Sequence, residues 1–159
     1  MKRSLPYLAF ATVVVVLDQL SKREIVHRLE LYDRVDVSAF FSWVHARNYG
    51  AAFSMLDDAG GWQRWFFVAL ALGFTAFILY ELRRLPPADR LMGWVYGLIL
   101  GGAIGNLIDR LQYGYVVDFL LFHYGSWSFP AFNVADMALS LGAALWIYCM
   151  FRDAREANE

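Results

Sequence analysis

Residues 91–110 read LMGWVYGLILGGAIGNLIDR, and this stretch decides the fold. Its apolar part, about residues 91–108, is long enough to cross the hydrocarbon core of a membrane, which takes roughly 20 helical residues. Glycine recurs every four residues along it, at Gly93, Gly97, Gly101 and Gly105. This spacing places the glycines on one helix face, where small residues let neighbouring helices approach closely. We therefore expect a central transmembrane helix.

The rest of the chain is also rich in apolar residues. Hydrophobic residues make up 59% of the 159, and the mean hydropathy is +0.40, values typical of a membrane protein rather than a water-soluble domain. Apolar stretches lie at about residues 5–20, 62–82, 91–108 and 134–151. We expect an all-α integral membrane protein, a single domain of residues 1–159 with four transmembrane helices.

The first apolar stretch is short, and Lys2 and Arg3 before it resemble the basic start of a signal peptide. No cleavage site of the small-x-small type follows. The stretch continues instead into the polar segment Asp18-Gln-Leu-Ser-Lys22. We therefore expect an uncleaved first span.

Positive charge predicts how the spans are oriented, because the basic side of a membrane protein faces the cytoplasm. The basic residues that flank the spans on one side are Lys2, Arg3, Arg83, Arg84, Arg90, Arg152 and Arg155. With four spans, both termini then lie in the cytoplasm. The connections at about residues 23–61 and 111–133 lie outside.

Polar residues near membrane depth gather on the opposite side. They end the odd spans and begin the even ones, at Asp18, Lys22, Gln63, Arg64, Asn106, Asp109, Arg110, Asn133 and Asp136. A channel or transporter more often places its ionisable residues near the midplane. A single layer at the outer interface indicates a site that meets something lying at the membrane surface.

Two segments between the spans have the pattern of short strands. Residues 40–53 predict strands with a turn at Asn48-Tyr49-Gly50. Together with residues 116–122 they are expected to form a small sheet that cradles the outer ends of the helices.

Two aspartates interrupt apolar sequence. Asp118 lies inside Val116–Phe122, and Asp136 lies in Phe132–Leu139. An ionised carboxylate is costly beside so much apolar surface unless it is paired, hydrogen-bonded or protonated. Each has a structural alternative: Asp118 as an exposed residue on an edge strand, and Asp136 as part of a helix cap with Asn133.

Two carboxylates that lie close together cannot both ionise easily, so they share one proton. One can then activate water while the other protonates the leaving group, as in aspartic proteases. This chemistry fits what the chain lacks: Cys149 is its single cysteine, and its histidines at positions 27, 45 and 123 lack metal-ligand spacing. We expect no metal, no cofactor and, with a net charge of -1, no nucleic-acid partner.

Two other interpretations stay open at this point. Lys22 could serve a Ser–Lys peptidase with Ser21 or Ser54, although adjacent residues on a helix point apart. A small four-helix transporter or assembly factor would bind or move a partner without cleaving it.

The chain resembles the bacterial signal peptidase II family over essentially its whole length. Five segments in order carry the resemblance: Asp18–Lys22, Asn48–Phe53, Gly101–Arg110, Val116–Phe119 and Phe132–Asp136. It implies four transmembrane helices with a small extracytoplasmic β-cradle. It also implies that Asp118 and Asp136 form the catalytic dyad. The implied substrate-binding and supporting residues are Asp18, Lys22, Asn48, Gly50, Asn106, Asp109, Arg110, Asn133 and Ala135.

The resemblance further implies an aspartic endopeptidase of the bacterial inner membrane. Its substrates would be prolipoproteins whose cysteine already carries diacylglycerol, and cleavage would fall just before that cysteine. A lipid anchor holds such a cysteine at the interface, where the polar layer is expected. Membrane lipids are the other expected partners, and nothing in the sequence demands more than a monomer.

Overall fold

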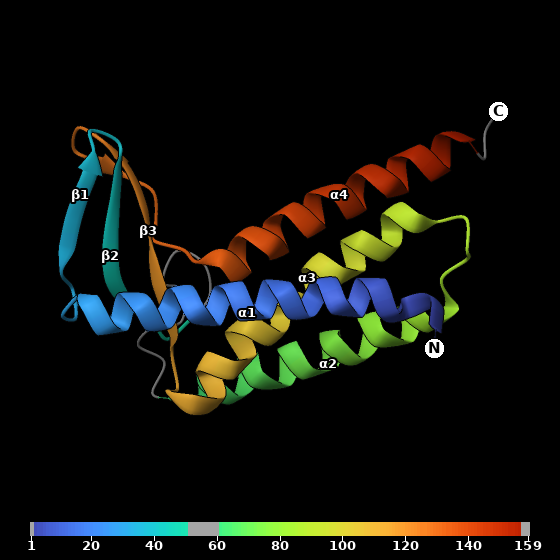
Figure 1. Ribbon diagram of the computed structural model, residues 1–159, viewed down its shortest axis with the longest axis horizontal. Coiled ribbons are helices and arrows are strands. Elements are labelled where there is room, and N and C mark those ends of the chain that lie inside the picture. Colours follow the sequence, from blue (N-terminus) through green and yellow to red (C-terminus); the bar gives the residue numbers. More distant parts are fainter. Residues whose placement is uncertain (1, 51–60, 157–159) are drawn as a thin grey trace.

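The computed structural model describes residues 2–50 and 61–156 of the chain and contains four long helices and a small sheet (Figure 1). A 3-10 turn, Lys2–Ser4, leads into the helices α1 (Leu5–Arg28), α2 (Trp62–Arg84), α3 (Arg90–Gln112) and α4 (Val134–Glu156). The strands are β1 (Arg34–Ser38), β2 (Phe41–Asn48), β3 (Val116–Tyr124) and β4 (Trp127–Ser128). All four helices are long and apolar enough to cross a membrane. The predicted fold class is confirmed.

Helix α3 is the central element of the bundle. In the most apolar 18-residue stretch of α3, 72% is buried inside the protein, whereas the corresponding values for α1, α2 and α4 are 22%, 17% and 22%. Its glycines meet α1 closely: a Cβ on Gly101 would lie 2.6 Å from the Cβ of Val14, and one on Gly105 would lie 2.7 Å from Oδ2 of Asp18. The predicted central role of this span is confirmed, and the glycines set the depth at which α1 and α3 meet.

Helix α1 extends further than hydropathy predicts. The first apolar stretch ends near residue 20, but the helix continues to Arg28. The polar residues Asp18 and Lys22 are both buried in it, with exposed fractions of 0% and 3%. They do not end the helix because they are paired with each other at helical spacing.

The sheet lies at one end of the bundle, at the opposite end from the two termini (Figure 1). Its four strands are antiparallel in the order β1-β2-β3-β4. Strand β2 pairs with β3 so that Ala46 lies opposite Asp118. The predicted small sheet is confirmed for the described residues, whereas residues 51–53 of the expected strand pair lie outside them. The end of α1, the start of α2, the end of α3 and the start of α4 all lie at the end of the bundle that carries the sheet (Figure 1).

The packing of α4 on α3 gives a test of the fold. A Cβ on Gly102 would lie 2.5 Å from the backbone oxygen of Ala135, directly before Asp136. We therefore expect Gly102→Ala to push the start of α4 away and to lower stability by about 1–3 kcal/mol, the usual cost of overpacking. The measurement is thermal unfolding of the purified protein in mild detergent.

Gly73→Ala on α2 is the matched control, because a Cβ there meets nothing within 4 Å. It should leave Tm unchanged or raise it slightly, since alanine favours helix over glycine by about 1 kcal/mol. Equal effects of the two substitutions would contradict the proposed tight contact between α3 and α4.

Candidate active site

Asp118 is buried on β3, with only 3% of its side chain exposed. Its two carboxylate oxygens accept hydrogen bonds from amide groups: Nδ2 of Asn48 donates to Oδ2 at 3.0 Å, and Nδ2 of Asn133 donates to Oδ1 at 2.7 Å. Strand β3 pairs with β2 at Asp118, and the burial of the side chain shows that this position does not face solvent. The alternative of an exposed residue on an edge strand is therefore wrong.

Asp136 lies in the first turn of α4. Its Oδ1 accepts a hydrogen bond from Nδ2 of Asn106 at 2.7 Å, and its Oδ2 accepts one from the backbone N–H of Asn133 at 3.3 Å. In return, its own backbone N–H donates to Oδ1 of Asn133 at 2.8 Å. This reciprocal pair is a helix cap. The cap and a role in the site are thus compatible.

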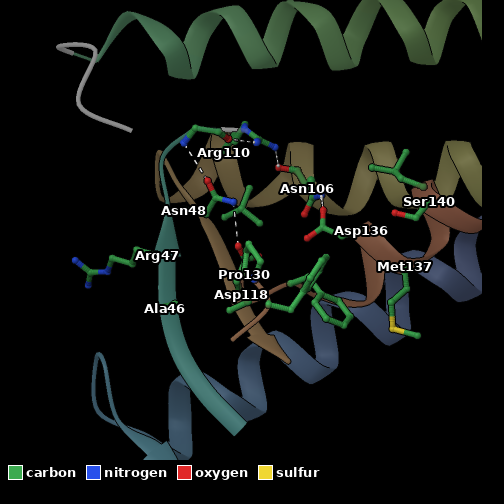
Figure 2. Close-up of a pocket in the computed structure, with 16 residues that line it drawn as sticks. Ala46, Arg47, Asn48, Asn106, Arg110, Asp118, Pro130, Asp136, Met137 and Ser140 are labelled. Carbon is green, nitrogen blue, oxygen red and sulfur yellow. Dashed lines mark hydrogen bonds between the residues drawn. The ribbon is translucent and has the colours of Figure 1, made fainter. Parts of the chain in front are cut away.

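The two aspartates line one cavity of about 620 Å³ (Figure 2). They come from different elements, and Asn133 bridges them by bonding to both. Predicted residues on the cavity wall are Asn48, Gly50, Asn106 and Arg110, joined by the apolar Val116, Phe129, Phe132, Met137 and Leu139. The cavity is therefore polar around the carboxylates and apolar on its other walls.

The surroundings of Asp118 hold a proton on it. Burial, and next the negative charge of Asp136, raise its pKa to about 7, against the opposing hydrogen bonds from Asn48 and Asn133. A carboxyl group in this position is half protonated near neutral pH. That is the condition under which a pair of acids shares one proton.

Behind the cavity lies a buried ionic cluster centred on Lys22. Its ammonium is 2.8 Å from Oδ2 of Asp18 and 3.1 Å from Oδ2 of Asp109. The same two carboxylates bind backbone beside the dyad: Asp18 accepts from the N–H of Ala135 at 2.8 Å, and Asp109 accepts from the N–H of Val117 at 3.0 Å. The structure therefore brings these predicted residues together as a support for both aspartates.

The cluster also bears on the Ser–Lys interpretation. The hydroxyl of Ser21 donates to the backbone oxygen of Asp18 at 2.9 Å, and Lys22 is occupied by two carboxylates. Ser21 and Lys22 therefore bond to different partners in the structure. Ser54, the other proposed partner, lies outside the described residues.

Arg110 links the end of α3 to the turn after β2. One of its nitrogens donates to the backbone oxygen of Gly50 at 3.0 Å, and another donates to that of Asn106 at 3.4 Å. Its guanidinium also lies over the ring of Phe67, 5.0 Å from the ring centre. Through these contacts Arg110 fixes backbone on the cavity wall that carries Asn106 (Figure 2).

Some contributors to the site were missed by sequence reasoning. Residues 129–132 form an apolar wall of the cavity, and Gln19 donates to Oδ1 of Asp109 at 2.7 Å. Gln19 carried a signal, since it is a polar residue beside Asp18 within an apolar span. The segment 129–132 carried none, because it is placed by tertiary contact: Phe132 bonds to the backbone of Leu120 on β3.

The fold and this site define an integral membrane protein with two carboxylates, the buried Asp118 and the half-buried Asp136, on one cavity at one end of a four-helix bundle. Residues 10–152 match the family model described as Signal peptidase (SPase) II. The chain therefore belongs to the signal peptidase II family, a family of peptidases. This membership sets aside the interpretations as a transporter or assembly factor.

Named relatives agree with this assignment. The chain is 52% identical to a lipoprotein signal peptidase of Shewanella woodyi over 135 residues, 85% of this chain and 77% of the relative. It is 43% identical to one of Alteromonas mediterranea over 98% of this chain and 85% of the relative. A solved bacterial membrane enzyme structure superposes with a TM-score of 0.85 at 30% identity, covering 94% of this chain and 89% of that one.

The amide of Asn133 gives a test of the site. Asn133→Asp keeps the cap to Asp136 but replaces the Nδ2 donor to Asp118 with a third carboxylate. We expect a loss of stability of about 1–3 kcal/mol, the cost of an unsatisfied buried group. The loss should be greater near pH 8 than near pH 5, because protonation relieves the repulsion between carboxylates.

Thermal unfolding at the two pH values is the measurement. Gln112→Glu is the matched control, because it makes the same amide-to-acid change at an exposed position. A pH-independent loss equal to that of the control would show that Asn133 does not serve the carboxylates.

Proposed function

We propose that this protein removes the signal peptide from diacylglyceryl-modified prolipoproteins, cutting just before the lipidated cysteine, and that Asp118 and Asp136 are its catalytic dyad. The observation that carries the proposal is the pair of carboxylates that come from separate elements, line one cavity and are bridged by Asn133. The names of the relatives support the substrate class.

The proposed chemistry needs one proton shared by the two acids. The ionised carboxylate takes a proton from water, whose oxygen then attacks the carbonyl carbon of the scissile peptide bond. The protonated carboxyl first hydrogen-bonds the carbonyl oxygen and later protonates the leaving nitrogen as the C–N bond breaks. The products are a new carboxyl end on the signal peptide and a free amino group on the cysteine. The pKa of Asp118, raised to about 7, supports a shared proton at neutral pH.

The proposed setting is the bacterial inner membrane. The basic residues near the chain ends and between α2 and α3 support a cytoplasmic location for both termini. The sheet and the dyad, at the opposite end of the bundle (Figure 1), would then lie at the periplasmic face. The apolar part of the cavity suits a substrate that carries acyl chains, and surrounding membrane lipids cover the exposed apolar faces of the helices. We propose that the monomer is sufficient for activity.

The remaining predicted residues are proposed to support the dyad or to bind the substrate backbone. They are Asp18, Lys22, Asn48, Gly50, Asn106, Asp109, Arg110, Asn133 and Ala135. Each of the nine bonds to another member of the set or to one of the two aspartates. The proposal therefore treats them as one connected network.

The dyad is tested by replacing each acid with its amide. Asp118→Asn and Asp136→Asn should each abolish cleavage, because the pair loses either its base or its acid, while the protein stays folded and membrane-inserted. The measurement is a gel-shift cleavage assay in mild detergent, with a prolipoprotein that carries or lacks its diacylglyceryl group. The wild type should cut only the lipidated form.

Unfolding curves of both variants provide the control for folding. Full activity in either variant would exclude the dyad. Equal cleavage of the unlipidated substrate by the wild type would overturn the proposed substrate class and leave the dyad intact.

The pH dependence is a separate test of the shared proton. Asp118 binds its proton below pH 7 and releases it above, given its raised pKa of about 7. With both acids ionised no proton remains for the leaving nitrogen, so kcat/KM should fall on the alkaline side with an apparent pKa near this value, which belongs to the pair. Activity should return when the pH is lowered again. A rate that stays constant well into the alkaline range would contradict the assignment.

A further inference from the structure

The ammonium of Lys22 uses all three of its N–H groups. It bonds to Asp18 and Asp109, and its third contact is Oδ1 of Asn106 at 3.0 Å. Only 3% of Lys22 is exposed, so these protein atoms replace water as its partners. The first two contacts balance its charge. The third contact has a different consequence, because Asn106 is an amide.

The contact with Lys22 fixes which way the Asn106 amide faces. An ammonium can only donate hydrogen bonds, so it must meet the oxygen of the amide. The NH₂ group of Asn106 is then forced toward Oδ1 of Asp136, to which it donates at 2.7 Å (Figure 2). The oxygen also accepts from Nδ2 of Asn133 at 3.3 Å, and Asn133 is the donor to Asp118. One cation thus orients the amides that serve both acids.

We propose that Lys22 is a positioning residue that acts through Asn106, keeping an amide donor on Asp136 and so making Asp136 the ionised base of the dyad, with Asp118 holding the proton. The inference rests on the dyad chemistry of the proposed function. Without Lys22, only the longer hydrogen bond from Asn133 holds the Asn106 amide, and its oxygen can then turn toward Asp136. An acceptor facing a carboxylate disfavours the charged form.

Two further observations also favour Asp136 as the ionised acid and Asp118 as the protonated one. Asp136 lies in the first turn of α4, where the helix dipole favours a negative charge, whereas Asp118 lies on a strand. The pKa of Asp118 is raised to about 7 by burial and next by the negative charge of Asp136, so Asp118 keeps its proton while Asp136 is ionised. Charged groups that act on the pair are Lys22 and Asp18 from α1 and Arg110 from α3, and Asp109 acts on Arg110. Arg47 on β2 also lines the cavity.

The experiment measures the acid limb of the pH–rate profile. Activity falls along this limb because both carboxylates become protonated and no base remains. Lys22→Met should move this limb upward by about one pH unit or more, because a hydrogen bond to a charged group is lost. A purely supporting role would lower the amount of active enzyme without moving the limb. The assay uses the full chain in mild detergent with the lipidated prolipoprotein.

Two companion variants keep the test decisive. Lys22→Met with Asp18→Asn removes one positive and one negative charge, so it retains the net charge of the cluster and carries the test where the single variant fails to fold. The amide oxygen that Asp18→Asn introduces can still accept the N–H of Ala135. In an Asn106→Ala background, the charge-balanced pair of changes at Lys22 and Asp18 should move the limb no further, because the route through the amide to Asp136 is already absent.

An unmoved limb in the charge-balanced variant, or an equal movement of that variant with and without Asn106, would overturn the inference. That result leaves the proposed function standing when Asp118→Asn and Asp136→Asn are inactive. Activity in those two variants would instead remove the dyad itself, so the two failures are distinguishable.

Discussion

The buried ion cluster of Lys22, Asp18 and Asp109 is the interaction on which the rest of the structure depends. Moving charges out of water costs several kcal/mol for each ion, and removing one partner of such a cluster typically costs about 3–5 kcal/mol. The cluster joins α1 to α3. Its carboxylates then bind the backbone at the start of β3 and the start of α4. A set of three side chains thus fixes four elements at the end of the bundle where the aspartates lie.

Close packing of the helices makes this cluster possible. Side chains as short as aspartate can span α1 and α3 only where the helices nearly touch. Gly101 and Gly105 allow that approach, and a Cβ on Gly105 would collide with Asp18 itself. Gly102 does the same for α4 against α3. The polar site therefore depends on the glycine pattern, because close packing at the glycines sets the depth at which the polar side chains meet.

Much of the fold could be predicted from the sequence, because it follows from apolar length and period. The four spans follow from hydropathy, and the central position of α3 follows from its glycines. The full length of α1 could not be predicted in this way. Asp18 and Lys22 are polar in any hydropathy scale, and only their pairing with α3 shows that they lie inside the protein and not at its edge.

The candidate active site, like the fold, could be predicted only in part. The two aspartates were recognisable from their apolar surroundings, and the family segments pointed to most of the residues around them. The hydrogen bonds among those residues could not be predicted, because they depend on how strands and helices meet. Asn133 is an ordinary helix cap in sequence, yet in the structure it touches both carboxylates. The wall formed by residues 129–132 depends on its contact with β3 and has no local pattern.

The hydrogen-bond partners of Asp118 and Asp136 bear on the proposed chemistry of a shared proton. A lysine or arginine placed directly on Asp118 and Asp136 would satisfy both and would also keep both ionised, so no proton would remain to be shared. Within residues 2–50 and 61–156, the side-chain hydrogen bonds that the two acids accept come from neutral amides, those of Asn48, Asn106 and Asn133. Amides satisfy buried oxygen atoms without adding charge. The nearest lysine is held one amide away, behind Asn106. The network can therefore stabilise both acids in a site largely removed from water and still leave them the single proton that the proposed reaction requires.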